Sequence, residues 1–147
     1  RAIAEGIGPG ATALSTAEAS GAVLASVDLI VAGAPLLGFS LPTESMVKSL
    51  ASNQAKDPTP PDLSHPAMRT WLEALPKGNG LAAAFETRIW WSPGSAAKAI
   101  LRLLGDAGYT AVAKPQKFIV QGKYGPLRDG ELERAKQWGA ELARSMK

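Results

Sequence analysis

Few residues in this 147-residue sequence could carry out chemistry on their own. There is no cysteine, which excludes disulfides, thiolate catalysis and cysteine-based metal sites. The single histidine, His65, stands beside Pro66 and has neither a serine–aspartate constellation nor a second metal ligand at a useful spacing. We therefore assign no catalytic residue and no metal site.

Two adjacent tryptophans, Trp90 and Trp91, are the strongest candidates for binding a ligand. They follow a predicted strand, and large apolar rings exposed at such a position commonly mark a site. The alternative is that one ring packs against a helix while the other is half exposed. Both interpretations remain open at the level of the sequence.

Two short segments could bind a phosphate or another anion. Gly6, Gly8 and Gly10 have the spacing of a dinucleotide loop, but they follow a predicted helix rather than a strand, so we interpret them as a turn. The segment 92–95 (Ser-Pro-Gly-Ser) opens a predicted helix and could bind an anion through its amides. Ordinary helix capping is the simpler interpretation of that segment.

The composition is that of one folded domain spanning residues 1–147, with 46% apolar and 20% charged residues. No apolar stretch reaches the roughly 18 residues of a membrane span, so we expect no membrane segment and a cytoplasmic protein. The net charge of +3 comes from interspersed acids and bases. A weak basic stripe is better explained as a solvated face than as a nucleic-acid site. Its members are Lys114, Lys117, Lys123 and Arg128.

Apolar runs and helical periodicities alternate along the chain. We predict a strand at 27–32 that is apolar on both faces, a strand at 81–89, and a final strand at 109–120 that is bulged near Pro115. A short strand at 11–15 is a weaker prediction. The predicted helices are 1–7, 43–51, 64–75, 95–107 and 129–147, with a helical turn across 16–25. This alternation is typical of an α/β domain whose parallel sheet is covered by helices.

The last two predicted helices each have one apolar stripe. In the helix at 95–107 we expect Ala97, Ile100, Leu101 and Leu104 to point inward. In the final helix the expected stripe is Leu132, Ala135, Gly139, Leu142 and Met146.

Three segments in this order resemble the bacterial flavodoxin-like family: 27–35, then 84–88 leading into 93–98, then 125–135 continuing to Trp138 and Gly139. The resemblance covers essentially the whole sequence. It implies a flavodoxin-like three-layer sandwich with a parallel sheet in the strand order 2-1-3-4-5. Because residues 1–7 resemble the end of the first helix of that fold, strand 1 and its phosphate loop are expected to precede Arg1.

The resemblance also implies a cofactor, flavin mononucleotide (FMN), at the carboxyl ends of the strands, where open α/β sheets generally bind ligands. The flavin ring is expected between the loops 33–42 and 88–94. Phe39, Trp90 and Trp91 would stack on it, and backbone amides would bind its pyrimidine edge. The cofactor-binding residues expected on this basis are Ala34, Pro35, Leu36, Leu37, Gly38, Phe39, Thr87, Arg88, Trp90 and Trp91.

Three functions fit these expectations. The first is an FMN-dependent electron carrier whose partner is a redox protein or a small electron acceptor, with a homodimer left open. The second is an NAD(P)H-dependent flavin or quinone reductase. The third is a flavin-free binding or regulatory domain, suggested by Leu36 and Leu37, which stand where the family often has hydrogen-bonding residues. Fold alone does not choose among them.

Overall fold

A parallel sheet forms the centre of the molecule, which a computed structural model describes at residues 1–36, 67–122 and 126–146. Its strands are β1 (Leu29–Pro35), β2 (Leu81–Arg88), β3 (Thr110–Ala111) and β4 (Gln116–Ile119). Strand β2 is central, with β1 on one edge and β3 followed by β4 on the other. The predicted strands at 81–89 and 109–120 are therefore confirmed, the second with an interruption that contains Pro115.

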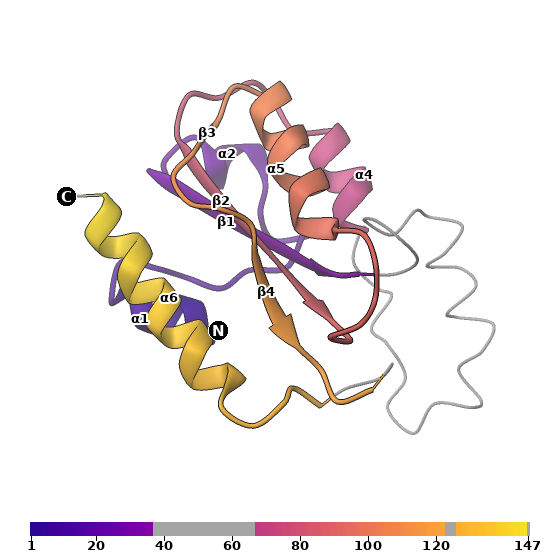
Figure 1. Cartoon of the computed structure of the whole chain (residues 1–147). Coiled ribbons are helices and arrows are strands. Elements are labelled where there is room, and N and C mark those ends of the chain that lie inside the picture. The colour runs from indigo at the N-terminus through magenta and orange to yellow at the C-terminus, as the bar shows by residue number, and fades with distance from the viewer. Residues whose placement is uncertain (37–66, 123–125, 147) are drawn as a thin grey trace.

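Helices cover both faces of this sheet (Figure 1). One face carries α2 (Gly21–Leu24), α4 (Met68–Glu73) and α5 (Ala96–Asp106), and the other carries α1 (Ala2–Ile7) and α6 (Glu131–Ser145). The arrangement is the α/β layering that the alternation of elements predicts.

The alternation of side chains along β2 divides the core in two. Ala82 and Ala84 belong to the cluster on the α5 face, whereas Ala83 and Phe85 belong to the cluster on the α6 face. Strand β1 alternates in the same way, because Ile30 packs toward α5 and its neighbours pack toward α6. The three alanines of β2 are at most 1% exposed, so both helical layers approach the sheet closely.

Helix α5 forms as its sequence predicts. Ala97, Ile100 and Leu104 are fully buried against the sheet, and Leu101 is half-buried. The Ser95 side chain accepts a hydrogen bond from the amide of Lys98 at 3.2 Å, which satisfies one of the free amides of the first turn. The segment 92–95 thus includes a helix cap, the simpler of its two interpretations.

The apolar stripe predicted for α6 is partly wrong. Leu132 is 62% exposed, and Met146 is also exposed. The buried positions are Glu131, Ala135, Trp138, Gly139 and Leu142. Glu131 takes the inward position at the start of the helix because its carboxylate accepts a hydrogen bond from the Ile119 amide at 2.6 Å, and this rotates Leu132 into water.

Helices α1 and α6 pack through glycine. A Cβ atom added at Gly139 would overlap the carbonyl oxygen of Ile3, and one added at Gly6 would overlap the carbonyl oxygen of Lys136. At these two glycines the backbones of α1 and α6 are therefore in direct contact, and the side chain of any larger residue would force the helices apart.

Strand β1 begins two residues later and ends three residues later than the predicted strand at 27–32, because Gly33, Ala34 and Pro35 continue it instead of starting a loop. The bonds from the Leu81 amide to the Asp28 carbonyl and from the Leu36 amide to the Thr87 carbonyl show that even-numbered residues face β2. Pro35 is odd-numbered and faces away, so its missing N–H removes no bond to β2. Gly33 lies opposite Phe85, whose ring occupies the place of a Cβ.

The outer edge of β1 is open. Leu29, Val31 and Gly33 direct their backbone groups away from β2, and these groups have no backbone hydrogen-bond partner among residues 1–36, 67–122 and 126–146. The predicted strand at 11–15 is wrong, since this segment is irregular and pairs with none of the described strands. It contains no run of large apolar residues that pairing would bury, and Leu14 is 43% exposed.

Other predictions before β2 are only partly confirmed. The helical turn expected across 16–25 is found as a turn followed by the four-residue α2, and the helix expected at 64–75 is the shorter α4. The helix expected at 43–51 and His65 lie outside the described residues. Among the helices of the described ranges, none combines the length and the apolar character that crossing a bilayer requires.

Candidate functional site

Strands β1 and β2 run parallel and end on the same side of the sheet (Figure 1). Pro35 lies in register with Thr87, and the Leu36 amide donates to the Thr87 carbonyl at 2.9 Å. The parallel pairing thus brings Ala34, Pro35 and Leu36 beside Thr87 and Arg88 at the carboxyl ends of the strands. Leu37, Gly38 and Phe39 lie outside the described residues.

The loop after β2 presents both tryptophans to solvent. Trp90 is 67% exposed and Trp91 is 65% exposed, so neither ring is packed into the core. A hydrogen bond of 3.1 Å from the Ser92 amide to the Ile89 carbonyl closes a turn around them. Gly94 then adopts a φ of 87°, a left-handed conformation that favours glycine, before α5 begins. The alternative in which one ring packs against a helix is wrong.

The carboxyl end of β1 contributes apolar side chains to the candidate site. Leu36 is half-buried and packs against the core cluster of the α5 face, while Pro35 is exposed. Thr87 is half-buried, and its carbonyl already accepts the bond from Leu36.

A buried carboxylate of β2 connects to both ends of the region that carries the tryptophan loop. Glu86 is 2% exposed and accepts three hydrogen bonds. Its Oε1 atom accepts from the Ser95 hydroxyl at 2.8 Å and from the Ala97 amide at 3.1 Å, and its Oε2 atom accepts from Arg88 Nη1 at 3.1 Å. The Ala97 amide belongs to the first turn of α5, where the helix dipole favours a negative charge. We call Glu86, Arg88 and Ser95 the Glu86 network.

Arg88 extends this network to the loop. The same Nη1 atom donates to the Gly94 carbonyl at 2.8 Å, and Nε lies 3.4 Å from the Ile89 carbonyl. The guanidinium thus contacts the first and the last residue of the loop 89–94 as well as the carboxylate of Glu86.

The sequence prediction assigned Arg88 a direct role in cofactor binding, whereas in the structure its side chain is engaged within the protein. The role of Glu86 was missed. The available signal was a glutamate inside an apolar strand with an arginine two residues later, a spacing that puts both on one face of the sheet.

A second glutamate–arginine network lies on the α6 face. Arg134 donates to Glu131 through Nε at 2.8 Å and through Nη2 at 2.7 Å, and it also bonds the Lys117 carbonyl. Its guanidinium lies 4.7 Å from the centre of the Phe118 ring. The hydrogen bonds from Arg134, together with that from the Ile119 amide, hold the pKa of Glu131 below its usual value. We call Glu131 and Arg134 the Glu131 network.

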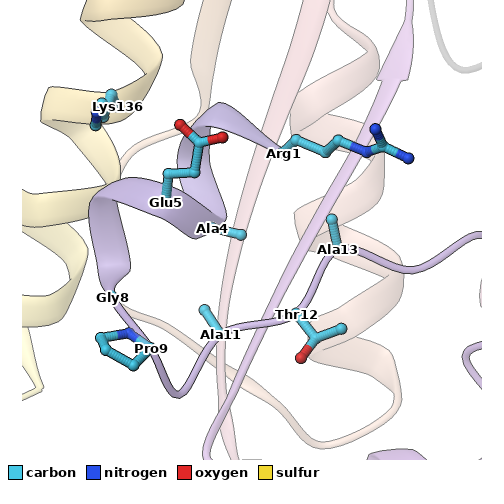
Figure 2. A pocket seen from close by; sticks show the side chains of 9 residues that line it. All are labelled: Arg1, Ala4, Glu5, Gly8, Pro9, Ala11, Thr12, Ala13 and Lys136. Atoms are coloured by element: carbon cyan, nitrogen blue, oxygen red, sulfur yellow. The ribbon is translucent and has the colours of Figure 1, made fainter.

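An open hollow of about 640 Å³ lies away from the tryptophan loop. Figure 2 shows it between α1, the segment 8–13 and Lys136. Its charged side chains, Arg1, Glu5 and Lys136, do not converge on one point in this view, so they form no binding cluster. Within the described ranges no group of three or more histidine, aspartate or glutamate side chains could hold a metal ion.

Two solved structures are similar to this chain over nearly its whole length. A flavodoxin from the domain Archaea aligns with a TM-score of 0.62 and 18% sequence identity, over 99% of this chain and 87% of the archaeal one. The metal-soaked flavodiiron core of Flv1 from a Synechocystis species aligns with a TM-score of 0.56 and 18% identity, over 99% of this chain and 31% of that one. No protein-family model and no curated protein matches the sequence. The chain therefore has a flavodoxin-like fold.

Proposed function

We propose that this chain binds FMN at the carboxyl edge of its sheet and transfers electrons. The observation that carries the proposal is the pair of exposed rings, Trp90 and Trp91, on a loop that leaves a flavodoxin-like sheet beside the end of β1. Exposed aromatic rings are costly in water and suit a flat, polarisable ligand that stacks on them. In open α/β sheets such a ligand binds at the carboxyl ends of the strands.

The described residues fit a flavin ring at this edge. Trp90 and Trp91 offer ring faces, and Pro35 adds an exposed apolar surface from the neighbouring strand. Bound FMN would supply the electron-transfer chemistry, while the protein would bind the ring and limit the access of water to it. A redox protein or a small electron acceptor would then be the partner.

A flavin-free binding domain is the second candidate, and one observation favours it. Arg88 has the polar side chain that could best bind a ligand at the carboxyl ends of the strands. Its guanidinium, however, is hydrogen-bonded to Glu86 and Gly94. Leu36 packs toward the core and offers no hydrogen bond. In that case the exposed tryptophans would dock another apolar surface.

A titration of the full chain with FMN tests the proposal. We expect binding of one FMN per chain, with quenching of flavin fluorescence as the ring stacks on tryptophan. Replacing both Trp90 and Trp91 by alanine should weaken binding by at least about tenfold, because stacking of one aromatic ring contributes about 1 kcal/mol. Leu132→Ala is the matched control, since it removes an exposed apolar side chain from α6.

Binding that is equally tight in the double variant would show that the tryptophans do not hold the flavin. A full chain that leaves FMN fluorescence unchanged at every concentration would reject the flavin proposal and favour the flavin-free candidate.

A further inference from the structure

We infer that the Glu86 network is a positioning device that fixes the place of Trp90 and Trp91 at the ligand site. The flavin part of the inference rests on the proposed function. The loop-positioning part rests on the geometry of the Glu86 network alone.

Within the described ranges, few contacts hold the loop. Segment 89–94 joins β2 to α5, and its two largest side chains are about two-thirds exposed, at 67% and 65%. These rings therefore contribute little burial that could fix the loop in one conformation. Among the described residues, the polar contacts of the loop are the turn between Ile89 and Ser92 and those made by Arg88, which bonds the Gly94 carbonyl and approaches the Ile89 carbonyl.

The network joins three elements through one carboxylate. Glu86 belongs to β2, Ser95 is the cap of α5, and Arg88 bonds the end of the loop between them. The side chain of Glu86 is 3% exposed and that of Arg88 is 10% exposed, so the ion pair is shielded from water. The two hydrogen bonds of Arg88 Nη1, at 3.1 Å and 2.8 Å, fix the Gly94 carbonyl relative to the strand.

A shielded ion pair is a poor way to gain stability. Removing two charges from water costs several kcal/mol, and well-packed apolar residues of similar volume often stabilise a protein equally well or better. What the charged pair adds is directionality, because a guanidinium binds its acceptors only in its own plane. A network with this geometry suits the task of holding a loop in one place.

Ordered rings bind a flat ligand more tightly than mobile ones, because less conformational entropy is lost on binding. Loosening the Glu86 network should therefore weaken ligand binding without removing any atom that touches the ligand. This is the result that distinguishes a positioning role from a contact role.

Arg88→Lys is the main test variant. Lysine keeps the charge but replaces the planar fork with a single ammonium group, so it cannot keep the same bonds to Glu86 and Gly94. Glu86→Gln is the second variant, because it removes the charge and can keep the Oε1 contacts to Ser95 and Ala97. Arg134→Lys is the matched control, since it makes the same change in the Glu131 network.

The first readout needs no flavin. We expect Arg88→Lys and Glu86→Gln to speed hydrogen exchange at the Ser92 amide, which bonds the Ile89 carbonyl, by about tenfold or more, with little change in the core of β2. Arg134→Lys should leave exchange at this amide unchanged. Unchanged exchange at Ser92 in both test variants would overturn the inference, and so would an equal increase throughout the protein, which indicates general destabilisation.

The second readout uses FMN. In both test variants we expect the dissociation constant to rise by about five- to twentyfold and the midpoint potential of the bound flavin to shift, with neither change in Arg134→Lys. Combining Arg88→Lys with alanine at both tryptophans should add no further loss, because the network acts through those rings. A further loss of the same size would show that Arg88 contacts the ligand directly and would overturn the inference. If the unmodified chain does not bind FMN, the proposed function fails while the exchange measurement still decides the positioning role.

Discussion

The two glutamate–arginine networks use the same chemistry on opposite faces of the sheet. In the Glu86 network the carboxylate joins β2 to the first turn of α5, and the adjoining loop carries rings that are 67% and 65% exposed. In the Glu131 network the carboxylate joins β4 to the first turn of α6, and Trp138 of that helix is 5% exposed.

The two networks differ in the aromatic rings that lie next to them. On the α6 face the rings of Phe85, Phe118 and Trp138 pack edge to face, with centroids 5.9 to 6.3 Å apart. Their burial stabilises the fold and offsets the entropy lost in ordering them. Beside the α5 face, Trp90 and Trp91 are 67% and 65% exposed, so holding these rings in place contributes little to folding. Tryptophan rings that are held in place without being buried are typical of a preformed ligand-binding site.

Trp138→Ala should have the largest effect on stability. Truncating a buried tryptophan in this cluster should cost about 3–5 kcal/mol, because it removes apolar contacts and leaves a cavity. Trp90→Ala, the same substitution in the exposed loop, should change the free energy of unfolding by less than about 0.5 kcal/mol. Urea denaturation of both variants measures this contrast. Similar losses in the two would refute the distinction drawn between the faces.

Gly139→Ala should have the next largest effect. Its Cβ would overlap the Ile3 carbonyl, so α1 and α6 must move apart, at a cost of about 1–3 kcal/mol. Gly105→Ala in α5 is the matched control, because no atom lies within 4 Å of the added Cβ. That control should stabilise the protein by about 0.5–1 kcal/mol through helix propensity. Thermal melts of both variants would show opposite shifts, and shifts of the same sign would contradict the packing described for the two helices.

Glu131→Gln should have a smaller effect that depends on pH. The folded state lowers the pKa of Glu131 below 4.5, so the ionised carboxylate stabilises the fold above that pH. This stabilisation is lost as the pH falls below 4.5 and the carboxylate becomes protonated. At neutral pH the variant should be less stable than the parent by about 1–2 kcal/mol. The difference should shrink as the pH falls through 4.5 and below it. Urea titrations on both sides of that pH measure it, and a constant difference would show that the ionised carboxylate is not responsible.

The sequence predicted best those elements whose periodicity agrees with their packing. Strand β2 and helix α5 are such elements, because their apolar residues meet the core on the expected faces. The end of β1 was not predictable, because Gly-Ala-Pro is typical of a loop. Only the register with β2 shows that Gly33 makes room for Phe85 and that Pro35 loses no bond to that strand.

Polar contacts between distant segments were the least predictable. The inward stripe of α6 was wrong at its two ends, Leu132 and Met146. At its start, a charged side chain, Glu131, takes the inward position and bonds the amide of Ile119. The tryptophan pair was predicted as a candidate site from residue type and position. The partners of Glu86 were not, because Ser95 and Ala97 approach it only after α5 has packed on the sheet.

The open edge of β1 makes the two sides of the candidate site unequal. Strand β2, which leads to Trp90, is hydrogen-bonded to strands on both sides, whereas β1 is bonded on one side within the described residues. Within this part of the molecule, thermal fraying should therefore affect β1 before β2, so the side of the candidate site formed by Pro35 and Leu36 should be more mobile than the side formed by Trp90. A ligand entering this edge would meet one fixed wall and one compliant wall.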